Sequence, residues 1–462
     1  MNKLDLTVSQ KCILCTPMND NKGHLHGLSA TSGNRRFSFM TAYFFFFCIV
    51  LVTISSAKTS TSAIAVVDLL RSLIALLVVI FGILNVFFIV RRNKTTKINL
   101  GVLIFVAIFF SYGLFLGFLN GGLQYFMAAP KLWLYSLIAI LFSFSLGSVT
   151  NSNALNRFLT KHVILYFLFV LALLLYYGGL IIDIPPYFVY EASDENALYS
   201  QGITSLFMIA ALSSMVLILQ QDSNFLKQVI GIFLTLVFIF LSLLGAARGD
   251  FVFGFILISI ILLFRKPIPL AIIGLIVCGI FAFSNLDFDN ITESFLLFQR
   301  LSGITDGDYG LRDVLAMQAL ELVFQNPWCL LFGGGFGYFQ KYYGYDYGMY
   351  PHNILLEFVI TFGLPVAIIT ILLFVIGITR IYKEKGSSNL ITIIGLYVLM
   401  IGLKSGSLIG FMTVGYLAYF TTIGVLSYPQ CIKQIYERSD FSNIRLTPMP
   451  GLAIKKDENG GV

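Results

Sequence analysis

Long apolar runs separated by short polar links dominate the pattern of this 462-residue chain. A helix needs about 20 apolar residues to cross the hydrocarbon core of a bilayer, and twelve runs come close to that length. Two of the runs are short, and only Lys404 separates the last two, so eleven helices are the alternative count. The pattern therefore predicts an all-α membrane protein, with candidate helices at 37–57, 62–90, 98–119, 132–149, 162–182, 201–220, 228–247, 250–264, 268–285, 353–379, 389–403 and 405–428.

The basic residues predict which side of the membrane each link faces. With the amino terminus in the cytoplasm, the segments on its side carry 22 lysine and arginine residues and the opposite segments carry 7. Because cytoplasmic segments carry the excess of positive charge, both termini are expected in the cytoplasm. Arg248, Arg312 and His352 then lie on the same outer face. No nucleotide pool exists there, so substrates on that face are exported or lipid-linked.

The longest polar link spans 286–351 and faces outward in this topology. A loop of this length between otherwise short links usually has a function. Within it, the spacing of apolar residues in Arg312–Phe324 predicts an amphipathic helix at the membrane surface. The predicted fold is an all-α polytopic membrane protein with 11–12 transmembrane helices and one large extracytoplasmic loop. Its parts are a polar tail (1–36), nine helices (37–285), the loop (286–351), three helices (352–428) and a cytoplasmic tail (429–462).

Composition agrees with this class and excludes others. Hydrophobic residues make up 57% of the chain and charged residues 11%, as in integral membrane proteins. The basic residues lie in the links and form no continuous patch, so no nucleic acid is expected as a partner. The amino-terminal tail is too long for the charged start of a cleavable signal peptide, which makes 37–57 an uncleaved first span.

Three short motifs suggest metal binding or glycosylation, but their spacing, position or frequency argues against each of these roles. Cys12 and Cys15, with two histidines downstream, fit no structural-zinc spacing, so neither a metal nor a cofactor is expected. The Asp-x-Asp sequence at 287–289 suits a metal-bound sugar nucleotide, but it lies on the side that lacks nucleotides. The glycosylation sequon at 290–292 is of a kind that arises often by chance.

Asp68 and Arg71 lie one turn apart near the outer end of the second run. Either charge alone would cost about 2.5–3.5 kcal/mol at the centre of a bilayer, so an ion pair is expected. Contact with a substrate is the alternative.

Two arginines of the outer face are candidates for binding an anion. Arg248 lies in a turn of small residues, Gly245–Asp250, which lets a large anion approach the backbone. Arg312 begins the predicted surface helix, whose amino-terminal end already favours anions. The alternatives are an interfacial anchor or a pair with Asp250 for Arg248, and solvation or a pair with Asp313 for Arg312.

His352 follows a proline at the start of the tenth run, just inside the outer interface. An unperturbed imidazole has a pKa of about 6.5, so its neutral form can accept a proton. A hydrogen-bonding role without catalysis is the alternative. Asn353 and Glu357 lie one helical turn apart and could line a polar entrance.

The outer loop is also rich in tyrosine. Six tyrosines interleaved with glycine suit stacking on sugar rings and hydrogen bonding to them, whereas an aromatic belt at the membrane edge is the alternative. Arg300 is a further basic residue of the loop. The glycine run at 333–337 is not a dinucleotide-binding fingerprint, because no βαβ unit surrounds it. The tyrosines are Tyr338, Tyr342, Tyr343, Tyr345, Tyr347 and Tyr350.

Together these motifs resemble the superfamily of O-antigen ligases and Wzy-type O-antigen polymerases. Pro351-His352-Asn353, followed after nine residues by Gly363, resembles its His-Asn signature at the span after a large outer loop. Arg248-Gly249 at the outer end of a span agrees with it. A second feature also agrees with the superfamily pattern: Arg312 begins a helix that is followed by Asn326-Pro327 and then by the glycine run. The resemblance covers about 230–375.

Two positions depart from the superfamily pattern. The residues before Arg248 are Gly245-Ala246-Ala247 where small polar residues are usual. Two residues beyond Gly363, where ligases often have Gly, Thr or Tyr, the chain reads Leu364-Pro365-Val366. The second departure weakens the resemblance to ligases more than the resemblance to the superfamily.

The resemblance implies an inverting, metal-independent glycosyl transfer at the outer face of a bacterial cytoplasmic membrane, with a glycan on undecaprenyl diphosphate as donor. Arg248 and Arg312 would hold the diphosphate, and His352 would orient or deprotonate the acceptor hydroxyl. The tyrosines, Asn353 and Arg300 are expected to contact the glycan. A flippase and a chain-length regulator are the expected protein partners.

A Wzy-type polymerase is the closest resemblance, and a ligase that moves finished glycan onto lipid A–core is the first alternative. A polysaccharide-lipid flippase is an alternative from another class. Transporters place charged groups near the middle of the membrane, whereas the charges within these runs are nearly confined to Asp68 and Arg71. The pattern thus favours outward-facing catalysis over transport.

Overall fold

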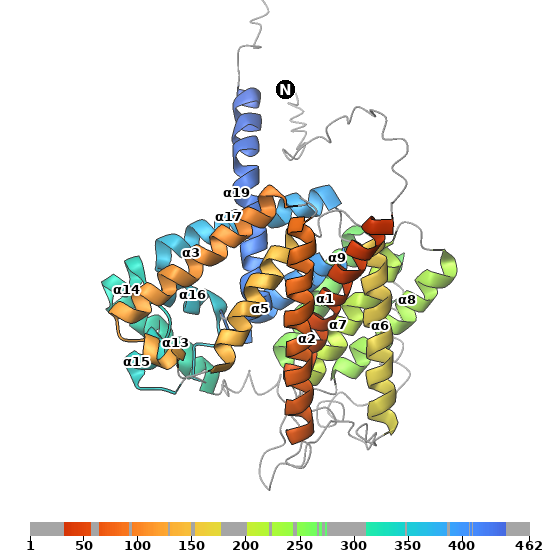
Figure 1. The fold of residues 1–462 in the computed structure, drawn as a ribbon, viewed down its shortest axis with the longest axis horizontal. Helices are drawn as coiled ribbons and strands as arrows, with labels where there is room; N and C mark the ends of the chain where they lie inside the picture. Colours follow the sequence, from red (N-terminus) through yellow and green to blue (C-terminus); the bar gives the residue numbers. More distant parts are fainter. Residues whose placement is uncertain are drawn as a thin grey trace, which may run out of the picture.

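The computed structural model describes the chain as helices joined by links, with no strand among the residues that it describes (Figure 1). For the ends of several helices only the backbone is described. The described residues are 32–56, 64–91, 95–127, 130–148, 153–176, 201–220, 224–243, 247–265, 268–269, 273–274, 311–346, 349–385, 389–405, 407–408 and 410–439. An all-helical fold is therefore confirmed for this part of the chain.

Most predicted runs correspond to one helix each. Four stretches are long and apolar enough to cross a membrane, namely Leu69–Arg91, Lys97–Leu119, Phe225–Leu243 and Leu364–Tyr382, so the count of twelve stays a prediction. The run at 268–285 lies almost entirely outside the described residues. The matching helices are α1 (Ser32–Ser56), α2 (Ile64–Arg91), α3 (Lys97–Leu119), α5 (Pro130–Leu146), α6 (Asn153–Tyr176), α7 (Gln201–Leu219), α8 (Phe225–Leu243), α9 (Arg248–Arg265), α18 (Leu390–Ser405) and α19 (Phe411–Ser439).

The prediction of a single helix over the tenth run, 353–379, is wrong, because this run forms two helices. α16 (Ile354–Phe362) ends at Gly363, whose φ of 85° and ψ of 157° turn the chain before α17 (Leu364–Lys385). A side chain at Gly363 would overlap the carbonyl oxygen of Leu331, so this close approach also requires glycine. Nine residues cannot cross a bilayer. α16 therefore lies outside the candidate span that begins at Leu364.

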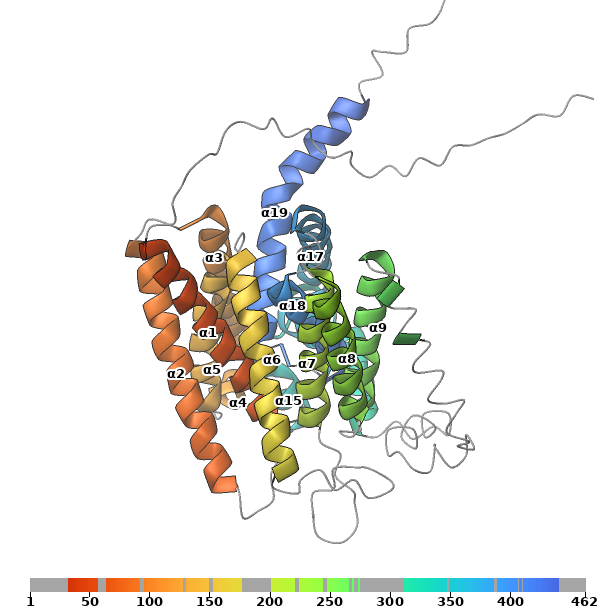
Figure 2. The ribbon, with the colours of Figure 1, turned by 90° about the vertical axis from the view of Figure 1, so that its right-hand side faces the viewer.

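The helices of the long loop gather at one side of the bundle, beside the sloping helices α3 and α17 (Figure 1). They are α13 (Leu311–Gln325), α14 (Pro327–Phe332) and α15 (Tyr338–Tyr343), and they pack with α16. In Figure 2, α19 ends and α1 begins at the upper end of the bundle. α15 and the short α4 (Leu123–Met127) lie toward the opposite, lower end. α15 of the loop and the two terminal helix ends thus lie toward opposite ends of the bundle.

The predicted surface helix forms as α13, with a wide apolar surface beside a narrow polar strip of Gln318, Glu321 and Gln325. Its inner side buries four apolar residues, and its outer side exposes four more. α14 continues the exposed row with Trp328 and Leu331. The buried residues are Leu315, Ala319, Leu322 and Val323, and the exposed ones are Val314, Met317, Leu320 and Phe324. A row of this kind needs an apolar environment.

We expect the exposed side of α13 and α14 to lie in the outer leaflet of the bilayer. The chain has 2 tryptophans, so the Trp133→Phe variant reports on Trp328 alone, whose side chain is 59% exposed. In vesicles, lipids with brominated acyl chains will quench its fluorescence, whereas aqueous iodide will not. The Trp328→Phe variant measures the other tryptophan as a control. Strong quenching by iodide together with no quenching by bromolipids would place this face in water.

Candidate functional site

The segment before α16 has an unusual backbone at His352. Its φ is 53°, and no other non-glycine residue among those described has a positive φ. The left-handed region costs a residue with a side chain about 1–2 kcal/mol, and such strain is concentrated at functional sites. The imidazole ring lies against the ring of Tyr350, with 3.9 Å between centroids. The buried Pro351 separates the two residues. The strained residue is thus the histidine that the sequence singled out.

Asn353 fixes where α16 begins. Its side-chain oxygen accepts hydrogen bonds from the backbone N–H groups of Leu355 at 2.9 Å and Leu356 at 3.2 Å. Asparagine is favoured at this capping position because it satisfies N–H groups that have no partner within the helix. Asn353 therefore serves the helix itself, and it does not line the cavity that lies beside α16.

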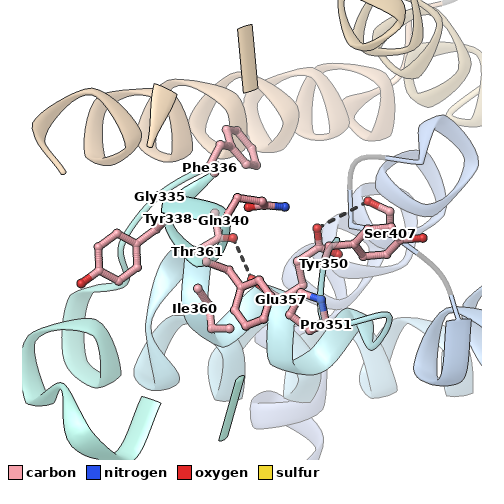
Figure 3. Close-up of a pocket in the computed structure, with 12 residues that line it drawn as sticks. Gly335, Phe336, Tyr338, Gln340, Tyr350, Pro351, Glu357, Ile360, Thr361 and Ser407 are labelled. Carbon is pink, nitrogen blue, oxygen red and sulfur yellow. Dashed lines mark hydrogen bonds between the residues drawn. The ribbon is translucent and has the colours of Figure 1, made fainter. Parts of the chain in front are cut away.

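A small pocket open to solvent lies between the glycine turn, α15, α16 and the link from α18 to α19, and is called the cavity below (Figure 3). Tyr350 and Pro351 contribute to its wall, whereas His352 does not. Polar and aromatic side chains face the cavity from elements far apart in the sequence. The lining residues are Gly335, Phe336, Gly337, Tyr338, Phe339, Gln340, Tyr350, Pro351, Glu357, Ile360, Thr361 and Ser407.

Glu357 is the one carboxylate among these lining residues. Its Oε2 accepts a hydrogen bond from the backbone N–H of Leu408 at 2.6 Å, and its Oε1 lies 3.4 Å from the Oγ of Ser407. Burial raises the pKa of the Glu357 carboxyl to about 7, because the loss of solvation outweighs the two hydrogen bonds that lower it. This carboxyl therefore changes its charge near neutral pH.

Arg248 is the first residue of α9, and its side chain lies outside the described residues. The next residue, Gly249, packs so closely on Lys404 that an added Cβ would lie 2.6 Å from the Nζ atom. Lys404 lies in the last turn of α18, just before Ser407 in the chain. The end of α18 and the link after it thus connect the start of α9 with Glu357.

Arg312 is the second residue of α13, a helix that packs directly on α16. Its side chain also lies outside the described residues, as do Arg300 and Tyr347 entirely. Both Arg248 and Arg312 therefore begin helices, and both helices pack on α16 or on its neighbour α18.

Three of the five described tyrosines tie the loop helices together. The hydroxyl of Tyr343 donates to the carbonyl oxygen of Gln318 at 2.8 Å, and that of Tyr345 donates to the Oε1 of the same residue at 3.0 Å. The hydroxyl of Tyr338 accepts a hydrogen bond from the Nδ2 of Asn326 at 2.9 Å. Of the other two, Tyr342 is 49% exposed and Tyr350 lines the cavity. Tyr350 and Tyr338 are therefore the tyrosines placed to contact a ligand in the cavity.

The glycine turn at 333–337 holds three elements against one another. The N–H of Gly334 donates to the carbonyl oxygen of Ile360 at 2.6 Å, and that of Gly335 donates to Thr361 at 3.1 Å. The N–H of Phe336 donates to the carbonyl oxygen of Gly113, in α3, at 2.9 Å. The turn therefore docks the end of α16 onto α3 and forms one wall of the cavity.

Sequence reasoning identified His352 and Glu357, but it missed Gln340, Lys404 and Ser407 as neighbours of the site. Gln340 is buried in α15 and faces the cavity (Figure 3). Nothing in the sequence marks a single glutamine or serine, because only the fold brings the two residues to the same cavity. Among the described residues, no group of three His, Cys, Asp or Glu side chains could hold a metal ion.

Apolar helices of membrane-spanning length, joined to a polar cavity at one end of the bundle, define a multi-pass membrane protein with a candidate active site. Residues 230–371 match a protein family described as O-antigen ligase. The match covers less than half of the chain and supports the resemblance to the O-antigen ligase and Wzy-type superfamily, whose members are glycosyltransferase-like membrane enzymes. The matched region runs from α8 into α17 and includes the whole cavity except Ser407. No curated protein and no solved structure matches the chain.

Proposed function

We propose that this protein polymerises undecaprenyl-diphosphate-linked oligosaccharide repeat units into O-antigen or a related surface polysaccharide, at the outer face of the bacterial cytoplasmic membrane. The family match over 230–371 is the observation that supports this proposal most directly, because it includes Arg248, Arg312 and His352. The cavity beside α16 adds polar and aromatic side chains of the kind that bind sugars.

The proposed reaction is a single displacement that inverts the anomeric carbon of the donor. A hydroxyl oxygen of the acceptor glycan forms a bond to that carbon, and the bond from the carbon to the diphosphate oxygen breaks. The diphosphate leaves with the bonding electron pair, and the acceptor hydroxyl loses its proton. Arg248 and Arg312 stabilise the charge that develops on the leaving diphosphate, since arginine offers a planar fork of donors. His352 orients the acceptor or takes up its proton.

Ligation of finished glycan to lipid A–core is the second candidate. The sequence Leu364-Pro365-Val366 at the start of α17 departs from the residues frequent in ligases, which favours a polymerase. A lipid flippase is the third candidate. Its charged groups would be expected within the spans, whereas the cavity with Glu357 lies beside α16, outside the candidate span. A flippase and a chain-length regulator would be partners of a polymerase.

The surface glycolipids of a strain that lacks this gene test the proposal. On a gel, lipid A–core capped with a single repeat unit is the expected result, because unpolymerised units would still be ligated. Bare core together with long glycan retained on undecaprenyl diphosphate would instead identify a ligase. An unchanged ladder would contradict both activities. Complementation with the wild-type gene is the control that assigns the change to this protein.

A further inference from the structure

The polar wall of the cavity is formed by residues to which the proposed reaction has so far given no role. Figure 3 shows the amide of Gln340, from α15, and the carboxylate of Glu357, from α16, pointing toward the same open space. Ser407 lies beside Glu357, and the ring of Tyr350 flanks it. The ring of His352 packs against the ring of Tyr350 at a tilt of 42°, and His352 does not line this space.

The hydrogen bonds of Glu357 leave one carboxylate oxygen suited to an incoming hydroxyl. The bond from Leu408 to Oε2 is short, at 2.6 Å, and fixes the orientation of the carboxylate. The contact of Ser407 with Oε1 is 3.4 Å, which is long for an O–H···O hydrogen bond. A carboxylate oxygen accepts more than one hydrogen bond, so Oε1 can accept a second from a ligand in the cavity.

Gln340 and Tyr350 complete a site for a sugar. The amide of Gln340 can both donate to and accept from hydroxyl groups, and an aromatic ring offers an apolar face to the C–H side of a pyranose. Ligand sites commonly combine such an apolar surface with a few convergent polar groups. Unlike the tyrosines that bind Gln318, Tyr350 has its ring in the cavity wall.

We propose that this cavity binds the hydroxyl-bearing sugar of the acceptor glycan and that Glu357 is the catalytic base that takes the proton of its attacking hydroxyl. The inference rests on the proposed function. As the oxygen of that hydroxyl bonds to the anomeric carbon of the donor, its proton passes to Oε1 of Glu357, and undecaprenyl diphosphate leaves with the electron pair. Gln340 hydrogen-bonds the acceptor sugar. His352 is then a positioning residue that supports Tyr350 and the start of α16.

The surroundings of Glu357 suit this role. A base is most effective when its pKa lies near the working pH, and burial brings the pKa of Glu357 to about 7. Burial also raises the pKa of Tyr338, so this lining tyrosine stays neutral at that pH. Lys404 lies at the end of α18 against Gly249, and Lys341 of α15 donates to the carbonyl oxygen of Asn120. The groups around the cavity are Tyr338, Tyr350, His352, Lys341 and Lys404.

The pH dependence of glycan transfer separates Glu357 from His352 as the base. With purified protein and lipid-linked repeat units, the wild-type rate will fall as the pH drops below about 7, because a protonated carboxyl accepts no proton. Glu357→Gln will lower the rate about a hundredfold or more, and its rate will no longer decrease below pH 7. In His352→Asn the rate will still decrease below pH 7; asparagine is chosen because it tolerates the positive φ of this position. The proposal would be overturned if the transfer rate still decreased below pH 7 in Glu357→Gln but not in His352→Asn.

A spectroscopic measurement that does not depend on glycan transfer tests whether the sugar contacts Glu357. Infrared difference spectra of the protein will show a carboxyl band that titrates near pH 7 and is absent in Glu357→Gln. The repeat-unit oligosaccharide, released from its lipid and added in solution, will shift this band. Glu321→Gln, which removes an exposed carboxylate of α13, is the matched control and will leave both band and rate unchanged.

The two readouts also distinguish failure of the inference from failure of the proposed function. A band that does not respond to the oligosaccharide overturns the acceptor site, whatever the transfer rates are. If the wild-type protein transfers no glycan although the band responds, the sugar site stands. In that case the proposed polymerisation, and with it the role of Glu357 as base, is overturned.

Discussion

Replacing Gly335 by alanine will destabilise the loop end of the bundle more than any other single change considered for this protein. Gly335 has a φ of 82°, and an added Cβ would overlap the backbone nitrogen of Gly117 and lie 2.5 Å from the carbonyl carbon of Leu116. Positive φ costs about 1–2 kcal/mol and overpacking typically 1–3 kcal/mol, so a loss of roughly 2–5 kcal/mol is expected. Thermal unfolding of the detergent-solubilised protein measures it.

Gly344 provides a matched control for this experiment. Its φ is 69°, also in the left-handed region, but an added Cβ would meet nothing within 4 Å. Gly344→Ala will therefore cost only the backbone term of about 1–2 kcal/mol. Equal losses of stability in the two variants would mean that the approach of Gly335 to α3 contributes nothing beyond its φ. The polymer ladder should shrink in Gly335→Ala and persist in Gly344→Ala.

The sequence predicted the helices well where length and apolarity decide the outcome. α2 and α3 lie within one or two residues of the runs at 62–90 and 98–119, because a long apolar segment bounded by polar residues has few other stable states in a bilayer. The break at Gly363 was missed because the apolar run continues through it, although a glycine followed by Pro365 is typical of a helix end. The positive φ of Gly363 and its approach to Leu331 both require glycine there.

The candidate site was predictable only in part, for a related physical reason. His352 stands out in the sequence because it follows a proline at the start of the run after the long loop, and the structure adds the strained φ at this residue. Gln340 and Ser407 meet Glu357 only through the packing of α15, α16 and the link after α18. The polar strip of α13, Gln318, Glu321 and Gln325, is narrow, so the sequence alone did not show that apolar residues are exposed on its outer side as well as buried on its inner side.

Arg248→Ala and Arg312→Ala will each nearly abolish polymer formation. Both arginines begin helices, where unpaired backbone N–H groups already favour an anion, and each would add a full positive charge beside the leaving diphosphate. Removing one such stabilising group typically lowers a rate by about 10²–10³, and a similar loss is expected here for transfer from undecaprenyl diphosphate. Initial rates with purified variants measure it, and polymer length in cells provides the parallel assay.

Conservative and distant replacements show whether the loss reflects anion binding. Arg248→Lys and Arg312→Lys will recover only part of the rate, because lysine supplies the charge without the planar fork of donors. Arg91→Ala removes an exposed arginine at the end of α2, whose guanidinium carbon lies 5.9 Å from the ring centroid of Phe87, and will leave the rate unchanged. Wild-type rates in Arg248→Ala or Arg312→Ala, at normal amounts of protein in the membrane, would remove that arginine from the reaction. The diphosphate would then have to be held by other donors, and Lys404, which packs against Gly249 at the start of α9, is a candidate.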